Sequence, residues 1–277
     1  MSELGDRSSL FKAESVPDAY ERYIAPALFE PWAELLLDAL AVSEGAQLLD
    51  VASGTGVVAR AAARRVGPGG RVVASDFSPA MLARSAAAVP PPGGAPLEFV
   101  EASAEALPFA DASFDVVLCQ QGLQFFPQRQ AAVDEMRRVL RPGGAVGIAV
   151  WADGHPLVPF GAYCEGLVAV GAEPPFPRAF DPETYQMSLE AVRTLVERAG
   201  FIAIEARVAE LDVSWPDPAT AAAGVLGTPY ATSLAALSAE QRERYDSIVL
   251  ARFDGPAEAG GPVTRQSAAV IVIATAP

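Results

Sequence analysis

The stretch "LLDVASGTGVVAR" (residues 48–60) carries the most informative pattern in this sequence. An apolar run enters a glycine-rich turn, G-T-G-V-V-A, which fits the fingerprint G-x-G-x-x-G/A of dinucleotide-binding folds. Glycines let the backbone approach a ligand where a Cβ atom would collide with it. Asp76 follows Gly56 by twenty positions, the spacing of a carboxylate that binds a ribose. The stretch predicts a strand, a turn that holds a nucleotide-like ligand, and a helix.

Strand-like and helix-like segments alternate along the rest of the chain, with short loops between them. Ser78 and Pro79 fit the N-cap and first position of one helix, and Pro26 and Pro31 start or kink helices nearer the amino terminus. This alternation predicts an α/β fold with a doubly wound, mostly parallel sheet. We expect strands at 46–52, 71–77, 96–102, 114–120, 145–151, 201–211 and 267–276, and helices within 18–41 and at 56–66, 80–89, 128–140 and 189–200.

Composition excludes several classes of function. The 277 residues include 20 Lys and Arg against 34 Asp and Glu, a net charge of −14, which disfavours nucleic acid or an anionic membrane surface as the main partner. One histidine and two cysteines cannot assemble the usual zinc ligand sets, so no metal is expected. The polar amino terminus does not resemble a signal peptide, and no apolar run could span a bilayer. We expect a soluble, cytoplasmic protein.

Asp50, just before the turn, distinguishes between possible ligands. A carboxylate that faces the turn would repel an anionic pyrophosphate, whereas a cationic ligand would benefit from it. The glycine pattern by itself fits both kinds of cofactor.

Four segments, "LLDVASGTG" (48–56), "ASDFSPAML" (74–82), "EASAEALPFADASFDVV" (101–117) and "EMRRVLRPGG" (135–144), resemble class I S-adenosylmethionine-dependent methyltransferases in order and spacing. The most similar group is the ubiquinone/menaquinone-biosynthesis-like group (methyltransferase type 11). The resemblance covers about residues 45–151, and residues 18–40 more loosely. It implies a seven-stranded Rossmann-like methyltransferase fold, S-adenosylmethionine as cofactor and S-adenosylhomocysteine as product.

The resemblance also implies roles for individual residues. Asp76 would accept both ribose hydroxyls, and Ser103 stands where many relatives have an aspartate that contacts the adenine amino group, so that contact is weaker here. The other residues implied to bind the cofactor fall into two sets. Those expected to contact the methionine end are Asp50, Ala52, Ser53, Gly54, Gly56, Cys119 and Gln120. Those expected to contact the adenine are Phe77, Met81 and Ala104.

Methyl transfer from a sulfonium is an in-line displacement that depends mainly on alignment and desolvation, so no catalytic triad is expected. Gln124 and Phe125 occupy positions that are often histidines in the family. His155, in the loop after the fifth strand, is the only histidine, and its ordinary pKa suits a general base. We name His155 and Gln124 as possible catalytic residues, with a structural or surface role for His155 as the alternative.

Two interruptions of the α/β pattern predict a helical cap that shapes an acceptor pocket. The expected division is an amino-terminal helical segment over the site (1–44), a cofactor-binding core (45–151), a cap insertion (152–188), a core helix and strand (189–213), a second cap insertion (214–262) and a last core strand (263–277). Aromatic residues predict an apolar or aromatic small-molecule acceptor. Possible substrate contacts are Tyr20, Tyr23, Phe125, Phe160 and Tyr163, with Phe176, Phe180, Tyr185, Trp215 and Tyr230 as further cap aromatics.

The favoured function is methyl transfer to a small molecule, with oxygen preferred to carbon and carbon to nitrogen as the attacking atom. Two alternatives stay open. A protein of the same fold could bind S-adenosylmethionine and catalyse another reaction or only bind ligand, and a nicotinamide-dependent oxidoreductase would use the same glycine turn. The later motifs count against the oxidoreductase. The sequence does not predict an oligomeric state.

Overall fold

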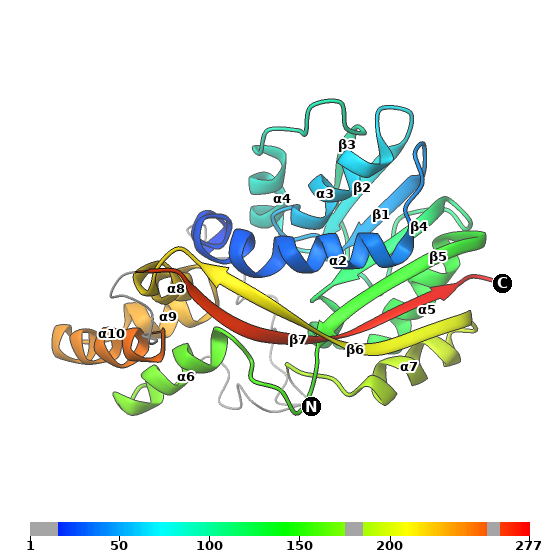
Figure 1. The fold of residues 1–277 in the computed structure, drawn as a ribbon. Helices are drawn as coiled ribbons and strands as arrows, with labels where there is room; N and C mark the ends of the chain where they lie inside the picture. Colours follow the sequence, from blue (N-terminus) through cyan, green and yellow to red (C-terminus); the bar gives the residue numbers. More distant parts are fainter. Residues whose placement is uncertain (1–15, 175–184, 254–260) are drawn as a thin grey trace.

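The computed structural model describes residues 16–174, 185–253 and 261–277. Its centre is one seven-stranded sheet with the strand order β3-β2-β1-β4-β5-β7-β6 (Figure 1). β7 runs antiparallel to both neighbours, and the other pairs are parallel. The predicted doubly wound, mostly parallel sheet is therefore confirmed. The strands are β1 (Gln47–Val51), β2 (Arg71–Asp76), β3 (Leu97–Glu101), β4 (Phe114–Gln120), β5 (Leu140–Trp151), β6 (Ile202–Trp215) and β7 (Val263–Thr275).

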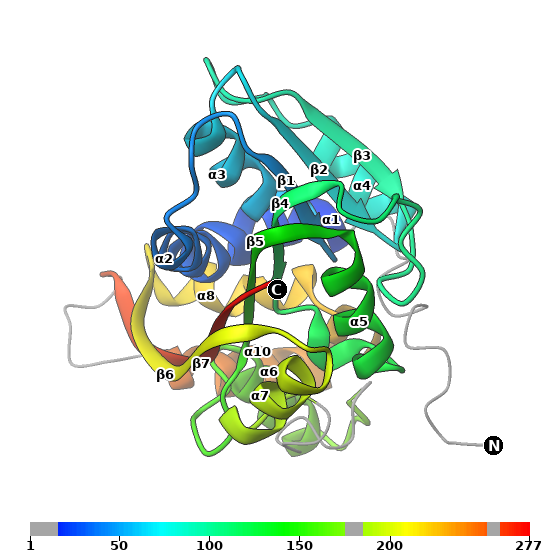
Figure 2. The ribbon, with the colours of Figure 1, turned by 90° about the vertical axis from the view of Figure 1, so that its right-hand side faces the viewer.

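Helices cover both faces of the sheet. One buried apolar cluster joins the sheet to α2 (Glu30–Leu40) and α3 (Val57–Val66), and a second joins the opposite face to α5 (Arg129–Val139) and α7 (Leu189–Arg198). Figure 2 shows α2 and α3 on one side of the sheet and α5 on the other. The sheet is buried on both faces, which explains the continuous apolar runs of its central strands.

The amino-terminal region forms three consecutive helical segments: α1 (Val16–Ala19), the π-helix η2 (Tyr20–Phe29) and α2. The amide of Glu30 donates to the carbonyl of Ala25, five residues back. Pro26 lies inside η2, where it has no amide hydrogen to donate, while Pro31 lies in the first turn of α2 as expected. π-Helical turns are rare and are found most often near functional sites.

Ser78 and Pro79 correctly predicted where the helix α4 (Pro79–Ala86) begins. The Ser78 hydroxyl accepts a hydrogen bond from the amide of Met81 at 3.4 Å, and Pro79 takes the first position. Both features satisfy or avoid free amide groups at the start of the helix.

The last strands are longer than their predicted ranges. β6 and β7 pair from Ile202 to Trp215, whereas β7 pairs with β5 only over residues 269–275. The rest of β6 and β7 continues as a two-stranded ribbon toward a group of short helices (Figure 1). Polar residues in "TRQS" (264–267) break the apolar run there, so the sequence pattern stops short of the real strand.

Several short helices gather at the end of this ribbon (Figure 1). They bury a group of aromatic side chains that includes Trp215, Tyr230 and Phe253. In the part of the chain that is described, no helix is long and apolar enough to cross a membrane. The helical segments of this region are α6 (Phe160–Ala169), α8 (Pro218–Ala223), η4 (Gly224–Gly227), α9 (Tyr230–Ala235) and α10 (Ala239–Phe253).

Candidate active site

The glycine turn connects β1 to α3 and is fixed to the neighbouring strand. The amide of Ser53 donates to the carbonyl of Ser75 at 3.0 Å. Gly54 and Gly56 both have positive φ, +54° and +84°, a backbone conformation that favours glycine. A Cβ atom on Gly54 would meet nothing within 4 Å, whereas one on Gly56 would lie 2.1 Å from the Ser85 hydroxyl. Gly54 thus leaves open space above the turn, and Gly56 allows α4 to pack closely.

Asp76, at the carboxyl end of β2, holds this turn in place. Its Oδ2 accepts from the amide of Gly54 and its Oδ1 from the amide of Ser78, both at 2.8 Å. Burial raises the pKa of the Asp76 carboxyl, and these backbone amides oppose the increase. Each carboxylate oxygen retains a second lone pair, so the residue can support the turn and still accept from a ligand.

Asp50 is a buried carboxyl group with one unsatisfied oxygen. The residue is 1% exposed, and its Oδ2 has no hydrogen-bond partner among the described residues. Burial raises the pKa of Asp50 well above its usual range; the amide of Ala59 opposes the increase, and the nearby charge of Asp76 adds to it. A carboxylate in this setting is stabilised by a cationic ligand.

The loop after β4 lies directly against the glycine turn. A Cβ atom on Gly122 would lie only 2.7 Å from the Cβ atom of Ala52. Gln120 donates through Nε2 to the carbonyl of Phe29 at 3.0 Å, which leaves its Oε1 without a described partner. Gln124 donates to Oε1 of Gln121 at 3.1 Å.

Several other buried polar atoms in this region have no partner among the described residues. The hydroxyls of Ser53 and Thr55 belong to the turn, and Nε2 of Gln121 and Oε1 of Gln124 belong to the loop after β4. Buried polar groups are normally hydrogen-bonded, so their concentration at the exits of two adjacent strands indicates a polar ligand. A ligand with an ammonium group and hydroxyls fits these atoms, and the open space at Gly54 gives it room.

The π-helix η2 is connected to the glycine turn by an ion pair that our sequence analysis missed. Arg60 donates to both carboxylate oxygens of Glu21 at 3.0 Å and to the carbonyl of Thr55 at 2.6 Å. Glu21 and Arg60 are each 15% exposed in this pair. They are 39 positions apart, so no local sequence pattern predicts this contact.

Tyr20, a predicted substrate contact, lies on the same helix close to the two aspartates. Its ring centroid is 5.0 Å from that of Phe29. Burial raises the pKa of the Tyr20 hydroxyl well above its usual range, and the charges of Glu21, Asp76 and Asp50 add to this effect. The first turns of η2 therefore lie beside the glycine turn. Tyr23 instead packs its ring on the guanidinium of Arg22, 5.9 Å away.

The predicted adenine contacts differ in accessibility. Phe77 is 37% exposed, whereas Met81 and Ala104 are buried. The Ser103 hydroxyl donates to Oε2 of Glu105 at 2.7 Å and accepts from the amide of Glu105 at 3.3 Å, which leaves one lone pair that could accept from an adenine amino group. A role for these four residues at the adenine stays a prediction.

Cys119 is fully buried at the end of β4. Burial raises the pKa of its thiol to about 12, and the charge of Asp50 contributes to the increase. Since the thiolate is the reactive form of cysteine, a buried thiol of this kind is a poor nucleophile, and the contact of Cys119 with the methionine end of the cofactor stays a prediction.

His155 lies beside β6, in the loop after β5. Its Nδ1 is 3.7 Å from Oε1 of Glu210, and its carbonyl accepts from Nε2 of Gln186 at 2.8 Å. Catalytic roles for His155 and Gln124 stay predictions.

Cap aromatics predicted to contact substrate pack mainly on one another. The ring of Phe125 contacts that of Tyr185 edge-on at 5.6 Å, Phe160 lies 6.4 Å from Trp151, and the buried hydroxyl of Tyr163 donates to the carbonyl of Ala221. Phe125 lies in the loop after β4. Its ring contact therefore connects this loop to Tyr185. Phe176 and Phe180 lie outside the described residues.

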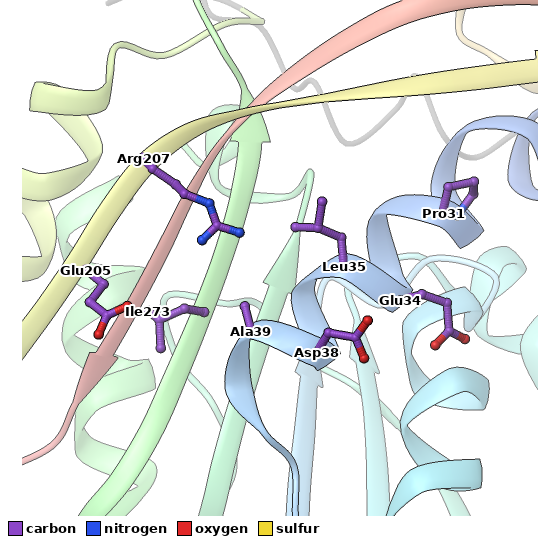
Figure 3. A pocket seen from close by; sticks show the side chains of 8 residues that line it. All are labelled: Pro31, Glu34, Leu35, Asp38, Ala39, Glu205, Arg207 and Ile273. Carbon is purple, nitrogen blue, oxygen red and sulfur yellow. The ribbon is translucent and has the colours of Figure 1, made fainter.

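An open groove on a different part of the surface runs between α2 and the sheet edge (Figure 3). It has none of the residues of the glycine turn. Its lining consists of Pro31, Glu34, Leu35, Asp38, Ala39, Glu205, Arg207 and Ile273.

Comparison with known proteins identifies the part of the chain that contains the site. Residues 49–148 match the family model of the methyltransferase domain. The ubiquinone/menaquinone biosynthesis C-methyltransferase UbiE of Hahella chejuensis is 36% identical over 165 residues, which are 58% of this chain and 66% of that protein. An uncharacterized protein of Mycobacterium tuberculosis, Rv1405c, is 40% identical over 128 residues, 46% of this chain and 45% of the relative. The chain thus spans about half the length of the first curated relatives it matches.

Solved structures share the fold at lower identity. The phosphoethanolamine N-methyltransferase 2 of Haemonchus contortus, in complex with phosphomonomethylethanolamine and S-adenosylhomocysteine, superposes with a TM-score of 0.61 at 20% identity, over 96% of this chain and 58% of that one. Residues 49–148 of this chain form a methyltransferase domain of the class I S-adenosylmethionine-dependent type, and the chain is similar over 165 residues to a ubiquinone/menaquinone-biosynthesis C-methyltransferase.

Proposed function

We propose that this protein transfers the methyl group of S-adenosylmethionine to a small-molecule acceptor. The observation that carries the proposal is the group of unsatisfied buried polar atoms around the open space at Gly54. The family match of residues 49–148 supports it. The sulfonium supplies an activated methyl group, so the protein has mainly to align the acceptor and exclude water.

The residues present fit this cofactor at both of its polar ends. Oδ2 of Asp50 and Oε1 of Gln120 are buried acceptors for the ammonium. Asp76 keeps lone pairs for the ribose hydroxyls after it has accepted from Gly54 and Ser78. The hydroxyl of Ser53 is a further donor or acceptor beside the methionine end.

The acceptor side is proposed to lie at the loop after β4. Gln121 and Gln124 form one hydrogen bond with each other, and this leaves one amide donor and one carbonyl acceptor unsatisfied. If the amide oxygen and nitrogen of both side chains were exchanged, one donor and one acceptor would still remain unsatisfied. The pair can therefore orient a neutral hydroxyl group, which supports oxygen as the preferred attacking atom, ahead of carbon and nitrogen.

The acceptor is proposed to be apolar or aromatic, with Phe125 at the junction of site and cap. Segments 152–188 and 214–262 would form the cap around it. Methyl transfer to carbon is the main competitor, because the relative from Hahella chejuensis is named a C-methyltransferase.

Substitution of Gly54 by alanine tests the position of the cofactor. The new Cβ atom meets no protein atom but would occupy the proposed methionine site. Gly200, which follows the carboxyl end of α7, is a matched control because it also has a positive φ and open space around it. We expect similar stability losses of about 1–2 kcal/mol in both variants. Only Gly54→Ala should weaken binding of S-adenosylhomocysteine in calorimetric titration; equal binding in both variants would contradict the proposed site.

Turnover distinguishes methyl transfer from the alternatives. The wild-type protein should convert S-adenosylmethionine to S-adenosylhomocysteine only when a suitable hydroxylated aromatic acceptor is present. Binding without turnover across a broad acceptor screen would favour a non-methylating protein of the same fold. Binding of NAD in place of S-adenosylmethionine would favour the oxidoreductase.

A further inference from the structure

The edge strand β6 has an outer side that pairs with no strand among the described residues, because β6 stands last in the sheet order. It is fourteen residues long. Two of its apolar side chains, Ile202 and Val208, are 52% and 41% exposed. A long edge strand with exposed apolar residues is a template for pairing with another strand.

The sequence of β6 is nearly symmetric about Ala206. Residues 204–208 read I-E-A-R-V. If a second copy of β6 pairs antiparallel with the first and Ala206 lies opposite itself, Glu205 faces Arg207 of the second copy. In the same register Ile204 faces Val208 of the second copy. Opposite residues of an antiparallel pair point to the same face of the sheet, so charges meet charges and apolar groups meet apolar groups.

The two charged residues have no ion-pair partner in the described part of the chain. Figure 3 shows Glu205 and Arg207 on the side of β6 that faces α2, across the groove from the carboxylates of Glu34 and Asp38. Those two carboxylates are already paired: Glu34 with Arg64 and Arg65, and Asp38 with Arg65. Glu205 and Arg207 are therefore available to one another across a two-fold axis.

A bulge limits how far such pairing can extend. The register between β6 and β7 shifts between Ile202 and Glu205, and Ala203 has a positive φ of +49°. A bulge ends regular pairing on an edge. Regular pairing with β7 resumes at Glu205, so Glu205, Ala206 and Arg207 at the centre of the symmetric segment lie on regular strand, and Ile204 lies at the end of the bulge.

From these observations we propose that two copies of this chain associate through β6, antiparallel and centred on Ala206, to form one continuous sheet. The interface is isologous: each copy contributes the same surface, and the contact between Glu205 and Arg207 occurs twice. A strand pair of this length buries little area, so we expect a reversible dimer with a dissociation constant on the order of micromolar.

Sedimentation equilibrium of the full chain over a concentration range tests the association. Arg207→Glu places two like-charged pairs in the interface and should weaken the dimer about tenfold. The double variant Glu205→Arg/Arg207→Glu restores opposite charges and should return the dimer to wild-type strength. Since both residues lie on the strand surface without ion-pair partners, neither variant should change the melting temperature of the monomer.

A single cysteine at the two-fold axis tests the register. In an antiparallel pair the Cα atoms of opposite residues lie about 4.5–5.5 Å apart, which a disulfide can span. Ala206→Cys should form a covalent dimer on mild oxidation with diamide, which accepts the two electrons and two protons of the two thiols. Val168→Cys, at an exposed position of α6, is the control, and the native Cys119 and Cys164 are buried.

Three results would overturn the proposal. The wild-type chain could remain monomeric at about 100 times the expected dissociation constant, the double charge variant could fail to restore association, or Ala206→Cys could crosslink no faster than Val168→Cys. A dimer that ignores both the charge reversal and the cysteine would use another surface.

Discussion

Replacing Asp50 by asparagine removes one negative charge from the proposed cofactor site and changes few atoms. Oδ2 of Asp50 has no hydrogen-bond partner among the described residues, and the carboxyl is buried. A hydrogen bond between charged groups contributes about 1.5–3 kcal/mol, so the loss of the contact with the ammonium should weaken binding of S-adenosylmethionine about 10- to 150-fold.

Proton release provides a second readout of the same contact. Burial raises the pKa of Asp50 above its usual range in the free protein, and a bound ammonium favours the charged carboxylate, which lowers that pKa. Binding below the raised pKa must therefore release a proton, and affinity should fall as the pH decreases through it. Asp76, Tyr20 and Arg60 also face this region, so the Asp50→Asn variant is needed to assign the proton.

The assay is calorimetric titration in two buffers with different ionisation enthalpies. The binding enthalpy of the wild-type protein should differ between the two buffers, because the released proton is taken up by the buffer. The binding enthalpy of Asp50→Asn should differ much less. 5′-Methylthioadenosine has no amino acid end, so both proteins should bind it equally. Asp111→Asn, an exposed aspartate paired with Arg138, is the control substitution. If Asp50→Asn binds S-adenosylmethionine within about twofold of wild type, the placement of the ammonium is refuted.

Three further changes have defined outcomes. Asp76→Asn replaces an acceptor of two backbone amides by a group with one donor end, so urea denaturation should show a stability loss of about 1–3 kcal/mol, together with weaker binding of both S-adenosylmethionine and 5′-methylthioadenosine. Glu21→Gln removes the charge opposite Arg60 and should raise the dissociation rate of S-adenosylhomocysteine in stopped-flow fluorescence about three- to tenfold; an unchanged rate would show that η2 is held by packing alone. Cys119, with a thiol pKa of about 12, has a thiolate fraction of about 10⁻⁴ at pH 8, so iodoacetamide should label it only after unfolding, and rapid labelling of the native chain would contradict its burial.

Some structural details overturn or refine what the sequence patterns alone indicate. Gly56 belongs to the glycine fingerprint, yet the contact that excludes a side chain there is with Ser85 of α4. Pro26 was expected to start or kink a helix and instead lies within a π-helix. In both cases the deciding contact or backbone geometry depends on the packing of segments that local spacing does not connect.

The sequence by itself determined the central architecture. Alternating apolar runs and helical patterns, with Ser78 and Pro79 at one helix start, contain enough local information for the strand and helix order. The turn at residues 52–56 was also predictable, because glycine and short polar residues are needed wherever a backbone approaches a ligand. Since these signals are periodic or confined to a few neighbouring residues, they are visible without an alignment or a structure.

Only the tertiary structure decided how the site is held together. The contact between Asp76 and Gly54 spans 22 positions, that between Arg60 and Glu21 spans 39, and that between Gln120 and Phe29 spans 91. The edge position of β6 likewise follows from the strand order. A one-dimensional pattern records what each segment prefers, but burial, unsatisfied atoms and pKa shifts arise when distant segments pack together.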